Sequence, residues 1–264
     1  MPAECATKFV SWLRSAESER LLRCIMMRCQ LDVHCHTTLS GHAHSTVREN
    51  AAYAASIGLG HIGVADHGPA LPGGTHLFTF VNLWVLPDYI HGVRVFKGVE
   101  ANICDANGNL DLPDELLKKM DFVIASMHRT VIAPSSRDDN TRALISAMEN
   151  PHVHILGHPI DLWYEIDIEA VVKAAARTKT VFEVNNQSLK PSSVRFSGEA
   201  VFKDALHMCK VYSVQVLASS DAHYCEAVGK VDRAMELIVS AGIDESYVLN
   251  TDVNRFIAAT CQKA

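Results

Sequence analysis

Seven short apolar runs divide the chain, and nearly all of them end in a residue that can bind a metal. The runs are Leu31–His36, Ile62–His67, Val95–Glu100, Phe122–His128, Val153–His158, Val181–Asn186 and Val216–His223. A short continuous apolar run bounded by turn residues is typical of a strand buried on both faces. Six of the seven runs close on His, Glu or Asp. The pattern therefore predicts buried strands with metal-ligand side chains at their carboxyl ends.

The segments between these runs have helical periodicity and recognisable starts. We expect helices over Thr46–Ile57, Asn140–Glu149, Asp167–Thr178, Gly198–Lys210 and Lys230–Ser240, with Asp167 as an N-cap. Strands that alternate with helices predict parallel strands joined by right-handed crossovers, hence a barrel or a doubly wound sheet. Seven units favour an α/β fold of the distorted (β/α)7, TIM-like barrel type.

Two segments rich in turn residues follow the second and third predicted strands. Gly68–Gly74 contains two prolines and three glycines, and Asp105–Asn109 contains the Asn-Gly pair typical of a tight hairpin. In such a barrel, both segments lie at the mouth formed by the carboxyl ends of the strands, where active sites are found.

The chain is long enough for one sizeable core, with 264 residues of which 48% are hydrophobic. We interpret residues 31–264 as a single barrel domain without an internal linker. Residues 1–30 form an N-terminal extension in which Phe9, Trp12 and Leu13 have helical spacing. This extension is either a helix that covers the barrel bottom or joins a subunit interface in a homo-oligomer, or a dispensable segment upstream of a start at Met26 or Met27.

Composition and charge exclude several classes of protein. The formal net charge of -6 argues against a broad electrostatic surface for nucleic acid or an anionic membrane, so small anionic substrates need a local positive centre such as metal ions. No run approaches the roughly 20 apolar residues that cross a bilayer, and no secretory signal is recognisable, so we expect a cytoplasmic protein. The eight cysteines include no Cys-x-x-Cys pair, and we expect reduced thiols.

Two predicted strand ends carry pairs of ligands two residues apart. Alternate side chains of a strand face the same side, so His34 and His36 can bind one metal while Cys35 points to the other side as a core thiol. Asp221 and His223 repeat this spacing at the last strand.

Together the strand ends supply a candidate ligand set of imidazoles and carboxylates without a thiolate. Its members are His34, His36, His42, Asp66, His67, Glu100, His128, His158, Asp221 and His223. Seven of the 14 histidines fall at or just after predicted strand ends, whereas a chance arrangement would scatter them. This mixture suits zinc, manganese or iron. Glu100 is the candidate bridge between two ions because it has two oxygens, and His76 is a candidate for substrate contact or proton transfer.

Several of these motifs occur together in a known superfamily. The strings Asp32–Thr37, Asp66–Gly68, Gly98–Asn102, His158–Pro159 and Ser220–His223 resemble those of the polymerase and histidinol phosphatase (PHP) superfamily, specifically its YcdX-like phosphatase branch. The resemblance runs from about residue 31 to residue 256. It implies a distorted seven-unit β/α barrel and a centre of three divalent metal ions, commonly zinc.

The resemblance also implies how the ligands are shared among the ions. It assigns His34, His36, Glu100 and Asp221 to one ion, Glu100 with His128 and His158 to a second, and His42, His67 and His223 to a third. All nine positions carry competent ligands in this sequence. The loops that would shape the pocket need not match any relative, so the resemblance does not identify the substrate.

We predict an enzyme, a metal-dependent phosphatase that acts on a small phosphate monoester. Clustered divalent ions bind phosphate oxygens and lower the pKa of a bound water towards about 7. A metal-bound hydroxide would then attack without any Ser or Cys nucleophile, with Glu100 as the bridging ligand. Arg129 is the candidate contact for the remaining phosphate oxygens because arginine matches phosphate bidentately. Lys190 and Arg195 are further candidates, although solvated surface charge is the simpler interpretation of both.

Three other functions stay open at this point. An amidohydrolase-type C–N hydrolase also begins with His-x-His and ends with Asp, but that fold often uses a carboxylated Lys on its fourth strand, and Phe122–His128 contains none. A PHP nuclease would require a long binding surface for nucleic acid. The net negative charge of the chain argues against such a surface. The third alternative is a metal-binding scaffold without catalysis.

Overall fold

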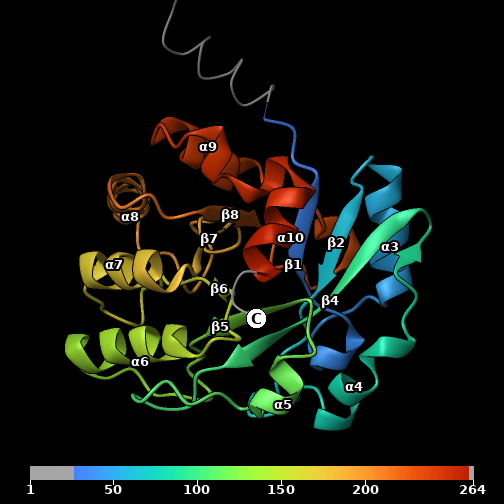
Figure 1. The fold of residues 1–264 in the computed structure, drawn as a ribbon, viewed down its shortest axis with the longest axis horizontal. Helices are drawn as coiled ribbons and strands as arrows, with labels where there is room; N and C mark the ends of the chain where they lie inside the picture. The colour runs from blue at the N-terminus through green and yellow to red at the C-terminus, as the bar shows by residue number, and fades with distance from the viewer. Residues whose placement is uncertain (1–26, 262–264) are drawn as a thin grey trace, which may run out of the picture.

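The structure, a computed structural model, describes residues 27–261 and is built around seven parallel strands nearly closed into a barrel (Figure 1). In sheet order the strands are β1 (Leu31–Cys35), β2 (His61–Val64), β4 (Val93–Asn102), β5 (Phe122–Ser126), β6 (Ile155–Leu156), β7 (Val181–Asn185) and β8 (Val216–Ser219). A short strand, β3 (Tyr89–Ile90), pairs antiparallel with β4. Cys35 and Ala222 form a parallel bridge at the seam between β1 and β8. The predicted barrel of seven units is confirmed.

Helices follow the strands, and most of them cover the outside of the barrel. They are α3 (Val47–Ser56), α4 (Leu77–Val81), α5 (Asp114–Leu117), α6 (Arg137–Glu149), α7 (Ile168–Thr178), α8 (Glu199–Val211), α9 (Asp232–Ser240) and α10 (Val253–Cys261). Within residues 27–261, five short 3-10 turns join them, η1 (Thr38–Ser40), η2 (Leu83–Val85), η3 (Cys225–Ala227), η4 (Glu245–Tyr247) and η5 (Leu249–Thr251). Figure 1 shows α6, α7 and α8 side by side on one flank and α3 on the other.

The five helices predicted from periodicity are all present, with small differences at their ends. The predicted N-cap of α7 is confirmed, because the Asp167 side chain accepts a hydrogen bond from the Ala170 backbone N–H at 3.0 Å. Helix α6 begins three residues earlier than predicted because Ser136 caps it by accepting from Asp139 N–H. The predicted tight hairpin is also present, where Ile103 and Leu110 form an antiparallel bridge. The predicted N-terminal extension lies largely outside the described residues, and its role stays a prediction.

The interior of the barrel is filled by apolar side chains from the strands and from α10. Phe96, Phe122 and Phe256 meet there, with ring centroids 5.1 Å apart for Phe96–Phe256 and 5.9 Å apart for Phe122–Phe256. Gly98 makes room for this cluster, since a Cβ atom at that position would lie only 2.3 Å from the Phe122 ring. Because the strands pack around a filled interior, their carboxyl ends are held in fixed positions.

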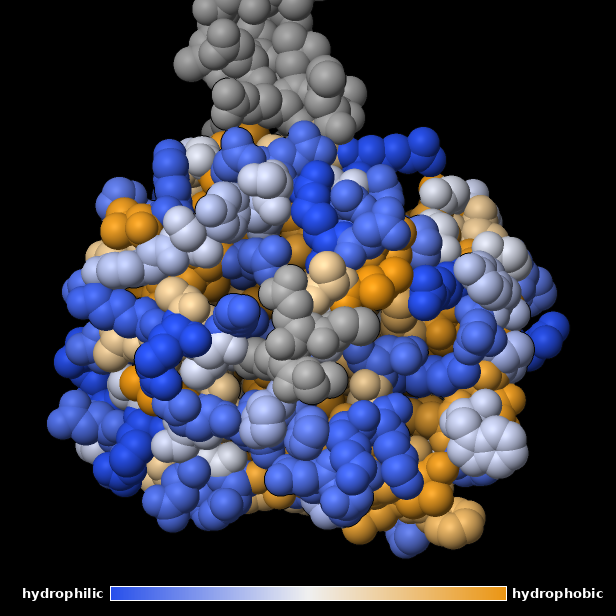
Figure 2. Space-filling view, in the orientation of Figure 1, coloured by the Kyte–Doolittle hydropathy of each residue, from blue (hydrophilic) through white to orange (hydrophobic). Residues whose placement is uncertain are grey.

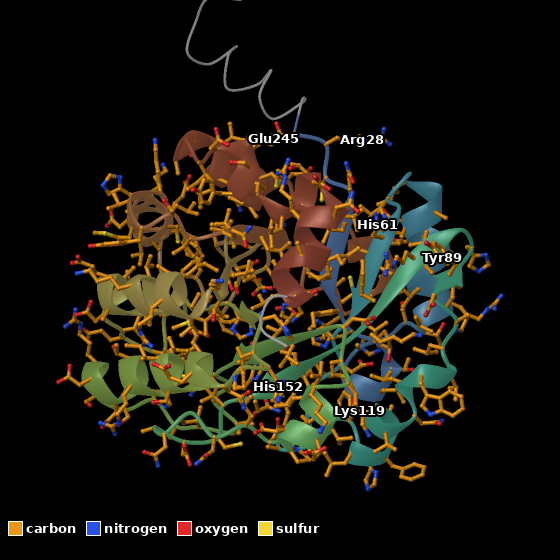
Figure 3. All side chains as sticks on the ribbon, in the orientation of Figure 1. Arg28, His61, Tyr89, Lys119, His152 and Glu245 are labelled. Carbon is orange, nitrogen blue, oxygen red and sulfur yellow. The ribbon has the colours of Figure 1, made fainter. Side chains whose placement is uncertain are left out.

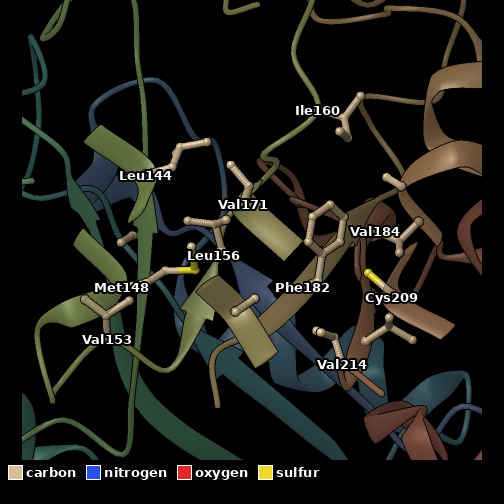
Figure 4. Packing of buried hydrophobic residues seen from close by; sticks show 14 of the residues in the cluster. Leu144, Met148, Val153, Leu156, Ile160, Val171, Phe182, Val184, Cys209 and Val214 are labelled. Carbon is tan, nitrogen blue, oxygen red and sulfur yellow. The ribbon is translucent and has the colours of Figure 1, made fainter. Parts of the chain in front are cut away.

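A second apolar layer lies between the strands and the helices that cover them. Figure 4 shows Leu144 and Met148 of α6 beside Val171 of α7, close to Leu156 of β6 and Phe182 of β7. All five side chains are buried. This layer fixes the flank of the barrel that carries β5, β6 and β7.

The surface is polar over most of the face seen in Figure 2, and apolar residues gather on it near α4. The exposed apolar side chains of that region include Leu77, Phe78, Val81 and Trp84, of which Trp84 is 75% exposed. No helix within residues 27–261 has the length and apolar character needed to cross a bilayer.

Candidate metal centre

The nine predicted metal ligands lie at the carboxyl end of the barrel, on or after six of its strands. They are His34 and His36 at the end of β1, His42 in the following loop, His67 after β2, Glu100 in β4, His128 after β5, His158 after β6, and Asp221 and His223 after β8. Parallel strands of a barrel end on the same side, so residues far apart in the sequence converge there. The structure brings all nine into one connected cluster.

Glu100 is the centre of this cluster, and both of its carboxylate oxygens face imidazole nitrogens. Its Oε2 atom lies 2.7 Å from His67 Nδ1, 3.3 Å from His34 Nε2 and 3.5 Å from His36 Nε2, and its Oε1 atom lies 2.9 Å from His158 Nε2 and 3.3 Å from His128 Nε2. The glutamate is fully buried. One carboxylate therefore connects two groups of histidines, as a bridging ligand must.

Asp221 provides a second buried carboxylate, which faces some of the same histidines. Its Oδ1 atom lies 3.2 Å from His36 Nε2, 3.5 Å from His223 Nδ1 and 3.7 Å from His34 Nε2. His42 joins the cluster from the rim, with its Nε2 atom 2.8 Å from His223 Nε2. The β8 end is thus connected both to β1 and to the loop that follows β1.

Four buried atoms of this cluster lack the hydrogen bonds that buried polar atoms normally make. His34 Nε2, His36 Nε2, His67 Nδ1 and Glu100 Oε2 are four of the seven buried side-chain N or O atoms without a hydrogen-bond partner in the described part of the chain. An unpartnered buried polar atom costs about 1–3 kcal/mol. The three nitrogens all face the same oxygen within 3.5 Å. This donor set fits divalent metal ions, which would accept electron pairs from all four atoms.

Three overlapping groups within the cluster have ligand atoms close enough to share an ion. They are His34, His36 and Asp221; His67, Glu100 and His128; and His36, His67 and His223, each with its atoms within 4.8 Å of one another. The first group lies within the first ion site that the family resemblance implies. The other two groups mix residues that the resemblance assigns to separate ions, so the assignment of each ligand to a particular ion stays a prediction.

Hydrogen bonds to neighbouring side chains and backbone carbonyls orient the imidazole rings. The bonds to ring nitrogens are His34 Nδ1 to Glu183 Oε1 at 2.5 Å, His128 Nδ1 to Asn102 Oδ1 at 2.7 Å, His42 Nδ1 to the Ser40 carbonyl at 3.0 Å, His223 Nδ1 to the Asp221 carbonyl at 3.0 Å, and His36 Nδ1 to Ser40 Oγ at 3.1 Å. A ring that donates from Nδ1 presents the lone pair of Nε2 to a metal. These contacts therefore determine which ring atoms a metal could bind.

Asp66, which the sequence placed among the candidate ligands, organises the β1 loop in the structure. Its Oδ1 atom accepts hydrogen bonds from Ser40 Oγ at 2.6 Å and from the Thr37 backbone N–H at 2.7 Å. Its Oδ2 atom accepts from the Thr37 hydroxyl at 2.7 Å. Asp66 thus fixes the turn that carries His36 and His42.

The electrostatics of the cluster keep its two carboxylates ionised. Burial raises the pKa of Glu100, but the neighbouring imidazoles of His67 and His34 outweigh it, and the pKa lies well below its usual range. Burial likewise raises the pKa of Asp221, but Arg195 and His34 bring it well below its usual range. A carboxylate must be ionised to bind a metal, so both groups are in the required state at neutral pH.

The two buried histidines of β1 have opposite pKa shifts. Burial, together with the nearby His67 ring, lowers the pKa of His36 well below its usual value, so this ring is neutral and has a lone pair available. Burial also acts to lower the pKa of His34, but the carboxylates of Glu183 and Glu100 outweigh it and raise the pKa. A metal that binds His34 must therefore displace a proton.

A cavity of about 690 Å³ opens beside the cluster. Its lining includes His42, His67, His128, Asp221 and His223, together with residues from the loops after β5, β6 and β7. Pockets of roughly 300–1,000 Å³ are typical of small-molecule sites. The cavity can therefore hold an organic molecule with one end at the histidine cluster.

Two arginines line this cavity, and the structure holds them differently. The Arg129 guanidinium lies over the Trp163 ring, 3.6 Å from its centroid, and Arg195 forms an ion pair with Asp221 Oδ2. The interpretation of Arg195 as solvated surface charge is wrong, because its side chain is only 18% exposed. Lys190, by contrast, is exposed and bonds Gln187 Oε1 at 2.5 Å.

His76 lies apart from the cavity lining. It is exposed, and its Nδ1 atom accepts a hydrogen bond from the Phe78 N–H at the start of α4. Other histidines also lie elsewhere, such as His61 at the opposite end of β2 and His152 before β6 (Figure 3). The proton-transfer role of His76 stays a prediction.

Sequence reasoning did not identify Glu183, Asn102 or Asn185 as site residues. The structure places all three on the strands β7 and β4, with their side chains bonded to the candidate ligands His34, His128 and Asp221. A usable signal was present in the sequence, because Glu183 and Asn185 alternate on β7 as His34 and His36 do on β1.

Known proteins with similar sequences are phosphatases by name. The sequence model of the PHP domain matches residues 32–189. A probable phosphatase from Thermoanaerobacter sp. (strain X514) is 48% identical over 230 residues, which cover 87% of this chain and 93% of that protein. A probable phosphatase from Clostridium novyi (strain NT) is 39% identical over 231 residues, covering 88% of this chain and 94% of that protein.

Solved structures with the same fold have much lower sequence identity. The histidinol phosphate phosphatase from Lactococcus lactis, solved with zinc, L-histidinol and phosphate, superposes with a TM-score of 0.59 at 16% identity and covers 81% of this chain and 94% of its own. A putative histidinol phosphatase from Listeria monocytogenes superposes with a TM-score of 0.53 at 14% identity, covering 76% of this chain and 97% of its own. At these identities the likeness shows a shared barrel fold.

Proposed function

This chain belongs to the PHP domain family and is a phosphatase of that family, and we propose that it hydrolyses a small phosphate monoester at a centre of three divalent metal ions. We propose zinc as the metal, with manganese or iron as the alternatives that the ligands also suit. The nine candidate ligands are His34, His36, His42, His67, Glu100, His128, His158, Asp221 and His223.

One observation carries the proposal. Three imidazole nitrogens and one carboxylate oxygen, from His34, His36, His67 and Glu100, are buried without hydrogen-bond partners, and each of the nitrogens lies within 3.5 Å of that oxygen. An arrangement without metal would leave these atoms unsatisfied at a cost of about 1–3 kcal/mol each. Divalent ions explain why a folded protein keeps them.

Divalent ions at such a centre bind phosphate oxygens and lower the pKa of a coordinated water towards about 7. The chain's own residues supply the rest of the site. Arg129 lies on the cavity wall with its guanidinium supported by Trp163, where it can donate two parallel hydrogen bonds to phosphate oxygens. Arg195 adds positive charge from the β7 loop, beside Asp221.

The cavity supports a substrate larger than inorganic phosphate. Its volume of about 690 Å³ leaves room for an organic group beyond the phosphate. The lining includes the apolar side chains of Leu71, Pro72 and Val194, and Trp163 adds an aromatic ring. We therefore propose an organic phosphate monoester as the substrate class.

A substrate panel combined with metal analysis tests the proposal. We expect the purified, zinc-loaded protein to hydrolyse phosphate monoesters and to leave cyclic amides and ureas intact. Glu100→Gln and His128→Ala should each lower turnover by at least about 100-fold while the fold is retained by circular dichroism, because each removes a ligand from the centre. Unchanged turnover in both variants would refute the scheme, and hydrolysis of amides alone would favour the C–N hydrolase.

A further inference from the structure

Strand β7 contributes no predicted metal ligand, yet Glu183 on this strand is buried directly behind the metal centre. Each of the two oxygens of its carboxylate accepts two hydrogen bonds. The donors are His34 Nδ1 at 2.5 Å and Ser219 Oγ at 2.6 Å to Oε1, and the His158 backbone N–H at 2.5 Å and Asn185 Nδ2 at 3.3 Å to Oε2. The residue is 1% exposed, so these four donors replace water as its hydrogen-bond partners.

The first of these bonds determines which nitrogen of His34 can bind a metal. Because Nδ1 donates to Glu183 Oε1, the proton of the neutral ring lies on Nδ1 and the lone pair lies on Nε2. That Nε2 atom is one of the unpartnered buried atoms, and it faces Glu100 Oε2 at 3.3 Å. Glu183 thereby directs His34 towards the first ion site.

The bond to His158 acts on the backbone and not on the ring. His158 has a φ of 27°, a positive value that residues other than glycine rarely adopt. Its N–H donates to Glu183 Oε2, and this strong acceptor holds the peptide in that conformation. The same conformation brings His158 Nε2 within 2.9 Å of Glu100 Oε1. Glu183 thereby also directs a ligand of the second ion site.

Asn185 extends the network to a third ligand. Its Nδ2 group donates to Glu183 Oε2 and also lies 3.2 Å from Asp221 Oδ2. Asp221 itself has a positive φ of 53°, which residues other than glycine rarely adopt. One buried carboxylate on β7 is therefore connected to candidate ligands that come from β1, β6 and β8.

We propose that Glu183 is a positioning residue. It holds His34, His158 and Asp221, ligands of the two proposed ion sites that share Glu100, in the orientations that metal binding requires. The inference rests on the proposed function, since it requires the metal centre to exist. Within residues 27–261 the hydrogen bonds of Glu183 reach none of His42, His67 and His223, which the resemblance assigns to the third ion. Loss of Glu183 should therefore affect two ions and spare one.

The substitution Glu183→Gln separates this role from simple space filling. Glutamine has nearly the same shape but only one acceptor oxygen, and its amide group is a donor. Whichever way the amide is turned, its NH2 group replaces one of the two acceptor oxygens. One pair of donors, either His34 with Ser219 or His158 with Asn185, then meets this NH2 donor and loses its acceptor. Ser219→Ala is the matched control, since it removes one buried bond to the same carboxylate and leaves both histidine bonds intact.

The experiment counts bound zinc per chain by mass spectrometry after equilibrium dialysis, beside turnover of a phosphate monoester. We expect three ions in the natural protein and in Ser219→Ala. With free zinc held at about ten times the Kd of the natural sites, we expect fewer than two ions to remain in Glu183→Gln, because loss of such an outer contact weakens metal binding by about 10- to 100-fold. Three tightly bound ions in Glu183→Gln would overturn the inference while leaving the proposed function intact. A natural protein that binds no zinc would overturn both.

A measurement on the natural protein alone covers the case in which Glu183→Gln does not fold. Two-bond ¹H–¹⁵N correlation spectra of the zinc-loaded protein report which ring nitrogen of each histidine carries the proton. We expect His34 to be protonated at Nδ1, with its Nε2 signal shifted by the metal. A proton on Nε2 of His34 would overturn the inference, since Glu183 would then not be preparing this ring for metal binding.

Discussion

At the level of single residues, Arg129 is the side chain whose proposed contribution to substrate binding is easiest to isolate. It lines the cavity, it is held by stacking on Trp163, and within residues 27–261 no hydrogen bond or ion pair joins it to a candidate metal ligand. Hydrogen bonds to a charged group contribute about 1.5–3 kcal/mol. We expect Arg129→Ala to weaken inhibition by inorganic phosphate, and to raise the KM for a phosphate ester, by about 10- to 100-fold.

Steady-state kinetics with inorganic phosphate as a competitive inhibitor measures this effect. Arg177→Ala is a suitable control, because Arg177 is an exposed arginine whose guanidinium pairs with Glu149 outside the cavity. The control should retain the natural inhibition constant. An Arg129→Ala variant with an unchanged inhibition constant for phosphate would remove Arg129 from the binding site.

The residues that the sequence could identify differ in kind from those it missed. A candidate ligand such as His128 lies at the end of an apolar run, so its position in the sequence alone identifies it as a candidate. Glu183 and Asn102 act through residues on other strands, and their partners His34 and His128 are known only once the strands are placed. Arg195 was misread for the same reason, because its pairing with Asp221 joins two distant loops.

At the level of elements, α10 closes the bottom of the barrel. Phe256 on this helix is fully buried against Phe96 and Phe122 of β4 and β5. Removal of a buried phenylalanine side chain costs about 3–5 kcal/mol. We expect Phe256→Ala to lower the free energy of unfolding by that amount, measured by urea denaturation, and Phe256→Leu to lower it by clearly less. A loss below about 1 kcal/mol in Phe256→Ala would mean that α10 does not close the barrel.

Elements that carry a long periodic signal were predictable, and short elements were not. Helices such as α7, with 11 residues and a capping Asp167, leave a clear pattern in the sequence. Helices α4 and α5 have five and four residues, which is too few to show a helical period. Strand β6 has only two residues, and its position was found because an apolar run and His158 mark it.

At the level of the whole molecule, the barrel explains why the candidate ligands can be so far apart in the sequence. His34 and Asp221 are separated by most of the domain, yet the bridge between Cys35 and Ala222 at the seam brings them together. The order of the strands follows the order of the chain apart from β3. The sequence order of the apolar runs was therefore enough to predict that their ends converge, although not the distances between them.

If metal binds at this convergence as we propose, the stability of the fold depends on it. Ions that bind only the folded protein stabilise it by about 2.7 kcal/mol for one site at a free concentration of 100 times Kd. For a domain of this size each kcal/mol shifts the melting temperature by about 2–4 °C. We expect removal of zinc by a chelator to lower the melting temperature by about 5–10 °C or more, measured by differential scanning calorimetry. Zinc should restore it, and Glu100→Gln should show a smaller difference because its bridging carboxylate is lost. Equal melting temperatures with and without chelator would show that the buried histidines and carboxylates are satisfied without metal.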